Sequence, residues 1–157
     1  MRTATPHFLM YTDFDESESI DEVAIGRWHV VLESVDGREY FEASSDEAGV
    51  VGERLELLAV VRGLEALDQP SRVTLVTPSR YVTRGIKYGL AEWCNAGWRW
   101  ESFGTMVPVK NGDLWQRVDA ALKFHEVSCR RWRIDQAHAE ISSEATAEVS
   151  VVEQQVA

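Results

Sequence analysis

The segment RLELLAVVRGLEAL, residues 54–67, constrains the fold more than any other part of the chain, because it is apolar nearly all the way round a helix. At ~100° per residue its aliphatic side chains form one continuous stripe and also cover much of the remaining surface. Such a helix is mostly buried and needs other elements around it. Glu56 lies at the margin of the stripe. Its carboxylate must therefore reach water or meet a cation or a hydrogen-bond donor.

Strand and helix signals alternate along the rest of the chain, which indicates a mixed α/β class. An Asp-Gly pair at Asp36-Gly37 between two alternating segments predicts a hairpin and hence an antiparallel start. Asn111 stands where a side-chain cap would begin a later helix. The predicted elements are, in chain order, strands 8–12, 24–34 and 38–43, helix 51–68, strand 73–77, helix 79–95, a helix from 111 to about 122, strand 127–132 and a polar helix 135–148.

Length and composition favour one domain with a sizeable core. The chain has 157 residues, 45% of them hydrophobic, and we expect a single domain over 1–149 with a frayed tail at 150–157. No apolar run is long enough to span a bilayer and the N-terminal segment lacks signal-peptide features, which favours a cytoplasmic protein without membrane contact. Cys94 and Cys129 are far apart. We expect two reduced thiols rather than a disulfide framework or a structural zinc site.

The charge balance disfavours a polyanionic partner, since 16 Lys and Arg face 26 Asp and Glu, for a formal net charge of -10. The charges are nevertheless segregated. Acidic residues crowd 13–22 and the C-terminal tail, whereas the middle and late chain carry a group of cations: Arg80, Arg84, Lys87, Lys110, Arg130, Arg131 and Arg133. This group is either an ordinary solvated face or a site for phosphates, and Arg80 and Lys110 are our candidate nucleic-acid contacts.

Four motifs share an order and spacing that identify a family. They are YTDFD at 11–15, RLELL at 54–58, VTLVTPSRYVTRGI at 73–86 and VPVKNGDLWQRVDAAL at 107–122. Together they resemble the bacterial-type ribonuclease H family, and the resemblance runs from about Phe8 to Ala145. It implies a ribonuclease H-like fold, a five-stranded mixed sheet with three antiparallel first strands, flanked by helices. VKNGDLW is the most specific of the motifs.

The resemblance also implies a chemistry. Family members hydrolyse the RNA strand of an RNA–DNA hybrid with divalent metal, Mg2+ or Mn2+, held by four carboxylates, and hard cations of this kind take oxygen ligands. The first-strand Asp of the family corresponds to Asp13 and its helix Glu to Glu56. These two are our candidate catalytic and metal-binding residues. Alternatively, Asp13 is only a strand-end residue and Glu56 only a partly exposed helix acid.

Two of the four family carboxylates have no counterpart. The family's Thr-Asp-Ser reads Thr77-Pro78-Ser79 here, and the fourth position falls on Ala139 or, with a shift of one residue, on His138. Proline and alanine carry no side-chain oxygen. Asp15, Asp135 and His138 are candidates to compensate, together with Glu140. If they do not compensate, a single metal ion on Asp13 and Glu56 would bind weakly, and the protein then works with weak metal binding or with no metal.

Further departures concern the substrate. Glu53 stands where the family commonly has a sugar-contacting Asn, and its charge has the wrong sign for a phosphate. The Trp side chains are read either as stacking platforms for bases or, for Trp93 and Trp115, as core residues. We therefore expect weak or lost catalysis, in a binding module for nucleic acid or for a protein partner. The alternative is an active ribonuclease H that uses compensating acids.

Overall fold

The computed structural model describes residues 4–19 and 21–131. The predicted final helix 135–148 and the tail 150–157 lie outside the described residues, as do the candidate compensating residues Asp135 and His138. Within the described residues, no helix combines the length and the apolar character needed to cross a bilayer.

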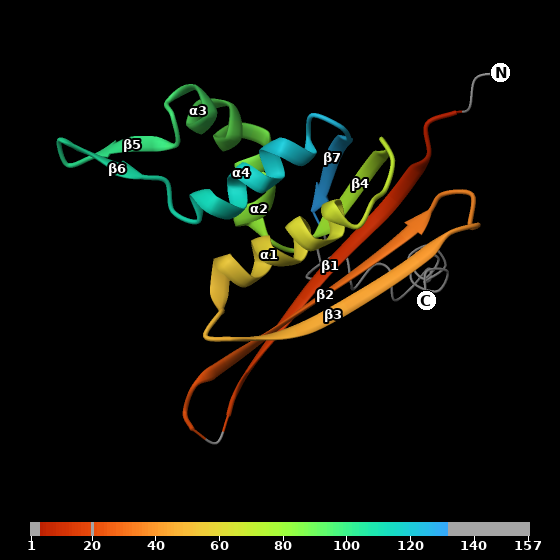
Figure 1. The fold of residues 1–157 in the computed structure, drawn as a ribbon, viewed down its shortest axis with the longest axis horizontal. Helices are drawn as coiled ribbons and strands as arrows, with labels where there is room; N and C mark the ends of the chain where they lie inside the picture. The colour runs from red at the N-terminus through yellow and green to blue at the C-terminus, as the bar shows by residue number, and fades with distance from the viewer. Residues whose placement is uncertain (1–3, 20, 132–157) are drawn as a thin grey trace, which may run out of the picture.

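A five-stranded mixed sheet forms the centre of the molecule (Figure 1). Its strand order is β3-β2-β1-β4-β7, and β1, β2 and β3 are antiparallel, whereas β4 and β7 run parallel to β1. This confirms the predicted sheet. The strands are β1 (His7–Glu18), β2 (Ala24–Ser34), β3 (Tyr40–Ala48), β4 (Arg72–Thr77) and β7 (Glu126–Arg131).

The apolar helix is α1 (Gly52–Glu65), and it packs against β1 and β2 and beside α4 (Gly112–Ala121). Seven of its residues are buried, as the stripe predicts. The helix approaches the sheet closely at Gly63, where a Cβ would lie 2.5 Å from Met10 Sδ and 2.8 Å from Val30 Cγ2. A Cβ at this position would therefore force the Met10 or Val30 side chain, or the helix itself, to shift.

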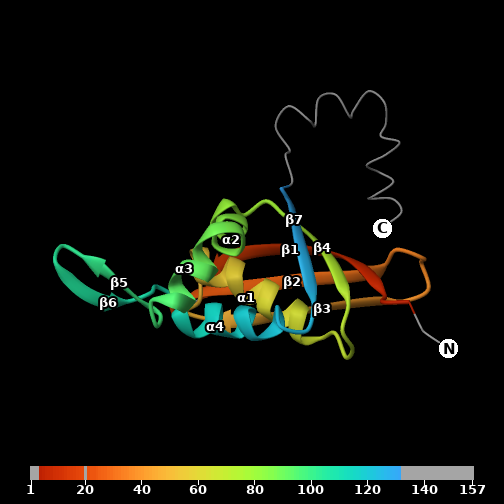
Figure 2. The ribbon, with the colours of Figure 1, turned by 90° about the horizontal axis from the view of Figure 1, so that it is seen from above.

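The helix predicted over 79–95 is present as three joined pieces (Figures 1 and 2). They are α2 (Arg80–Arg84), a π-helical turn η1 (Gly85–Gly89) and α3 (Leu90–Asn95). The Ser79 hydroxyl accepts a hydrogen bond from the N–H of Val82 and so caps the start. At Gly85 the helix rests on the indole of Trp115, which is fully buried.

Four details differ from the sequence-based expectation. Strand β3 was predicted over 38–43 but runs from Tyr40 to Ala48, along the length of β2 with which it pairs. Strand β1 extends six residues beyond Thr12, because its exposed end pairs with the start of β2. The hairpin of β5 (Arg99–Ser102) and β6 (Thr105–Pro108) projects from the body with Phe103 fully exposed at its tip, and no strand was predicted there (Figure 1). Asn111 precedes α4 as predicted, but its backbone has the left-handed conformation, with φ 57°, and its side chain makes no capping hydrogen bond.

Candidate functional site

The end of β1 and the end of β4 meet beside a groove of about 370 Å³. Tyr11 and Val76 are paired across these parallel strands, and two residues further along each strand stand Asp13 and Pro78. Both line the groove, together with residues of β1, β2 and β4: Tyr11, Thr12, His29, Val31 and Val76. Pro78 therefore lies alongside Asp13, where the resemblance leads us to expect a third carboxylate.

Glu56 on α1 is held by a serine at the start of α2. The Ser79 hydroxyl donates a hydrogen bond to Glu56 Oε1, and the Ser79 N–H donates to Thr77 Oγ1 at 3.1 Å. Ser79 and Thr77 are buried, so these bonds satisfy polar groups that water does not reach. Ser79, the residue after Pro78, is thus the hydrogen-bond donor that the Glu56 carboxylate was expected to need. Glu56 is therefore tied to the start of α2 beside Pro78, but it is not among the described residues that line the groove.

The described residues do not by themselves fit a two-metal centre. Mg2+ favours near-octahedral oxygen coordination, and a two-metal site needs several converging carboxylates. Among residues 4–19 and 21–131, no group of three or more His, Cys, Asp or Glu side chains is placed to hold a metal ion. Asp15 is exposed on β1, two residues beyond Asp13, and its carboxylate accepts the N–H of Glu16. Asp13 and Glu56 stay the candidate metal ligands that the resemblance implies.

An imidazole also lines the groove. His29 on β2 is the cross-strand neighbour of Asp13, and its Nε2 lies 2.6 Å from Glu42 Oε2. The Tyr40 hydroxyl donates to the other oxygen of Glu42 at 3.0 Å. These hydrogen bonds, first from His29 and then from Tyr40, hold the pKa of the Glu42 carboxyl below its usual range. Only the strand register, which a sequence motif does not contain, brings His29 to Asp13.

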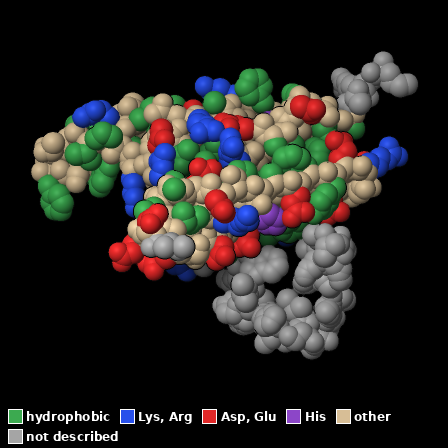
Figure 3. All heavy atoms as spheres, turned by 60° about the horizontal axis from the view of Figure 1, so that its bottom comes forward, with side chains coloured by type: hydrophobic (Ala, Val, Ile, Leu, Met, Phe, Trp, Pro, Cys, Tyr) green, Lys and Arg blue, Asp and Glu red, His purple; other side chains and the backbone are tan. Residues whose placement is uncertain are grey.

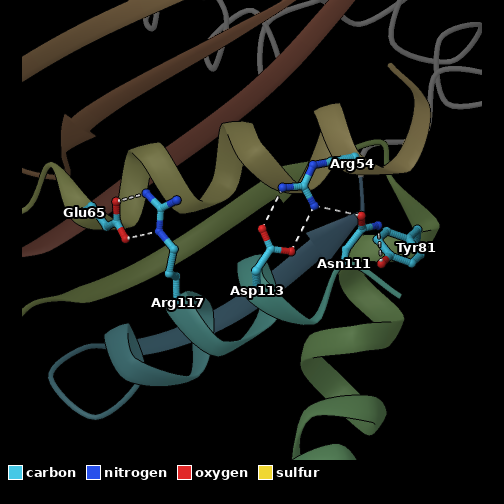
Figure 4. Close-up of polar contacts among 6 residues, drawn as sticks. All are labelled: Arg54, Glu65, Tyr81, Asn111, Asp113 and Arg117. Atoms are coloured by element: carbon cyan, nitrogen blue, oxygen red, sulfur yellow. Dashed lines mark hydrogen bonds and ion pairs between the residues drawn. The ribbon is translucent and has the colours of Figure 1, made fainter. Parts of the chain in front are cut away.

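The VKNGDLW motif forms a polar clamp between helices (Figure 4). Arg54 on α1 donates two hydrogen bonds to the carboxylate of Asp113, at 3.0 and 2.7 Å, and one to Asn111 Oδ1 at 3.1 Å. The Asn111 amide and the Trp115 indole both donate to the Tyr81 hydroxyl. The Arg54 guanidinium lowers the pKa of Asp113. In this chain the motif therefore fixes α1, α2 and α4 to one another.

The two candidate phosphate contacts differ in their surroundings. Lys110 forms an ion pair with Glu53, at 3.0 Å from Nζ to Oε1, and this carboxylate raises the pKa of the lysine. Arg80 instead lines a second pocket, of about 250 Å³, that the sequence did not predict. Its lining comes from α2, η1 and β7: Arg80, Thr83, Arg84, Lys87, Tyr88 and Cys129.

The surface seen in Figure 3 is predominantly acidic toward its lower edge. Acidic side chains gather at the lower left, where the end of the β1–β2 hairpin lies, and Glu18, Asp21 and Glu22 are exposed there. Hydrophobic side chains instead occupy the projecting β5–β6 hairpin at the left. On this face the acidic side chains are therefore concentrated near the β1–β2 hairpin.

Comparisons with known proteins give a consistent result. The family model described as RNase H matches residues 6–154. The chain is 40% identical over 117 residues to a protein named Ribonuclease H from Paracoccus denitrificans, which covers 73% of this chain and 72% of that protein. It is 39% identical over 137 residues to a Ribonuclease H from Jannaschia sp., with 85% and 82% covered.

Solved structures share the fold at lower sequence identity. One described as LC9-RNase H1, a type 1 RNase H with the type 2 active-site motif, superposes with a TM-score of 0.69 at 23% identity, over 99% of this chain and 76% of that one. The PFV RNase H domain gives a TM-score of 0.61 at 18% identity, over 92% of each chain. The mixed sheet is therefore a ribonuclease H-like fold, and this chain belongs to the RNase H family.

Proposed function

We propose that this protein is a ribonuclease H-fold domain that binds nucleic acid with weak or no hybrid cleavage. The observation that supports the proposal best is the position of Pro78. Pro78 lines the groove with Asp13, at the position where the family has a third carboxylate ligand. Glu56 accepts a hydrogen bond from the hydroxyl of the neighbouring Ser79. Loss of ligands from a two-metal site removes transition-state charge stabilisation of several kcal/mol, which is about 10³-fold or more in rate.

The test is a cleavage assay on a labelled RNA–DNA hybrid, with the intact protein in Mg2+ and then in Mn2+. The Paracoccus denitrificans relative, named Ribonuclease H, serves as the reference enzyme. We expect a rate at least about a hundredfold below the reference, with hybrid binding retained in a parallel anisotropy measurement. Turnover close to the reference would contradict the loss of catalysis, and absence of binding at low salt would contradict the binding module.

The second candidate is an active ribonuclease H that cleaves the RNA strand of hybrids with Mg2+. It is favoured by identities near 40% to proteins named Ribonuclease H. In this case Asp15, Asp135 or His138 would supply the missing ligands beside Asp13 and Glu56. The distinguishing result is metal-dependent cleavage by the wild type that is lost in Asp13→Asn. It should also be lost in a single variant of Asp15, Asp135 or His138. Cleavage that survives Asp13→Asn would come from a contaminant and would not support this candidate.

A further inference from the structure

The second pocket presents one polar helical face to solvent. Arg80, Thr83, Arg84, Lys87 and Tyr88 follow the spacing i, i+3, i+4, i+7 and i+8, so their side chains lie along one side of α2 and η1. Cys129 on β7 closes the pocket from the sheet. Lys87 and Tyr88 belong to the π-helical turn, and such turns are frequent at functional sites.

Three cations share this pocket without an acidic partner among the described residues. The ion pairs of the described chain engage Arg54, Lys110 and Arg117, among others, but none includes Arg80, Arg84 or Lys87. Like charges at i, i+3 and i, i+4 repel one another and destabilise a helix. Since no acid of the described residues neutralises these cations, an anion bound from outside would relieve their repulsion.

Buried contacts also hold in place the helical turn that carries the cations of the pocket. Thr83 is buried and its hydroxyl donates to the carbonyl of Arg80, which fixes the turn that carries two of the arginines. Beneath them, Gly85 lies against the buried Trp115 indole. Tyr88 is 72% exposed beside the cations and offers an aromatic face and a hydroxyl. A guanidinium fork matches two phosphate oxygens at once, which favours phosphate over a monovalent anion.

We propose that the pocket of Arg80, Arg84 and Lys87 binds backbone phosphates of a nucleic-acid strand that also passes the Asp13 groove. Pro78 lines the groove and Arg80, two residues later, lines the pocket, so both openings lie at the start of α2. The inference rests on the proposed function and deepens it, since it names the cations that hold the strand. Lys110, paired with Glu53, contributes less.

The first experiment measures hybrid binding by fluorescence anisotropy over a salt series. The double variant Arg84→Gln/Lys87→Gln is compared with the control Arg38→Gln/Lys123→Gln, which removes the same charge from exposed positions at the opposite end of the sheet. We expect the pocket variant to bind the hybrid about tenfold more weakly. The slope of log affinity against log salt concentration should fall in magnitude by about 1 to 2, because a variant that contacts fewer phosphates releases fewer counterions on binding. The control should keep the wild-type slope.

The second experiment uses the thiol in the pocket wall. Cys129 is alkylated in a full-length Cys94→Ser background, at mildly alkaline pH because burial raises the pKa of the Cys129 thiol. We expect the hybrid to slow the alkylation at the concentrations at which it binds, and inorganic phosphate to do so only in the millimolar range. Protection by inorganic phosphate at the same concentration as the hybrid would assign the pocket to free phosphate and overturn the backbone assignment.

The outcomes separate the two proposals. If the wild-type protein binds no hybrid at low salt, the proposed function fails, and the inference fails with it. If the wild type binds but the pocket variant and the control have equal affinity and slope, only the inference is overturned. Unchanged alkylation of Cys129 in the saturated complex would overturn it as well.

Discussion

At the scale of single residues, Pro78 is the substitution that matters most. We expect Pro78→Asp to bind Mg2+ more tightly than the wild type, because a third carboxylate would join Asp13 and Glu56. Pro78 is exposed after the last residue of β4, so the change should cost under about 1 kcal/mol of stability. Calorimetric titration with Mg2+ measures the difference, and Pro78→Asn controls for loss of the ring. Equal affinities in all three proteins would show that Pro78 does not occupy a ligand position.

Glu53 gives a second prediction at this scale. Glu53→Gln should strengthen hybrid binding about two- to fivefold at low salt, because it removes a negative charge and releases Lys110 from its ion pair. Anisotropy against the same labelled hybrid measures the change. Glu39→Gln, an exposed acid in the turn before β3, loses the same charge and should have a smaller effect. Equal gains from both variants would mean that only net charge matters.

At the scale of elements, the packing of helix 80–95 depends on a glycine. In Gly85→Ala the new Cβ would lie 2.1 Å from Trp115 Cη2 and 2.4 Å from Cζ2, so the helix or the buried indole must move. We expect a loss of about 1–3 kcal/mol in the free energy of unfolding, measured with urea. Gly112→Ala is the matched control, since its Cβ would meet nothing closer than 3.8 Å and should be neutral or mildly stabilising.

The contact between α1 and α4 should be sensitive to acid. Arg54 binds Asp113 at one end, and Arg117 binds Glu65 at 2.6 and 2.9 Å at the other (Figure 4). Each guanidinium lowers the pKa of its carboxyl. A lowered folded-state pKa contributes stability that is present above the unfolded pKa, 3.8 for Asp and 4.5 for Glu, and is lost as the pH falls through the folded value.

We therefore predict that Arg54→Gln/Arg117→Gln destabilises the protein at neutral pH and makes the unfolding free energy less dependent on pH below about pH 4.5. Both acids are substantially exposed, so each pair should contribute no more than about 1 kcal/mol. Urea unfolding at pH 7 and near pH 3 measures both effects. An unchanged difference between the two pH values would contradict the assignment.

The elements that the sequence predicted well are those with a buried face. Helix α1 is apolar nearly all the way round and strand β4 is short and β-branched, and both have buried faces that the sequence pattern indicates. The β5–β6 hairpin escaped prediction because its side chains are largely exposed, which leaves no periodic apolar signal. Asn111 was expected to cap its own helix, but Arg54 and Tyr81 provide tertiary partners for the amide. His29 reaches the groove only through the register of β2, which no local motif records.

At the scale of the whole molecule, the separation of charge should govern the rate of association. Replacing Glu18, Asp21 and Glu22 by amides removes three negative charges from the hairpin end and changes the net charge from -10 to -7. We expect faster association with the hybrid at low salt, measured by stopped-flow fluorescence. The gain should vanish near 1 M salt, where the Debye length is about 3 Å. A gain that persists at high salt would indicate direct contact instead.

Strand β3 lies at the edge of the sheet and pairs only with β2 among the described strands. An edge strand offers unpaired N–H and C=O groups to another chain, and charged side chains are a common protection against such pairing. Glu42, Asp46 and Glu47 give this edge its negative charge. Near pH 4.8, the calculated isoelectric point, repulsion between molecules weakens and the protein should be prone to intermolecular strand pairing. The acidic surface that we expect to slow association with nucleic acid should therefore also keep neighbouring molecules apart.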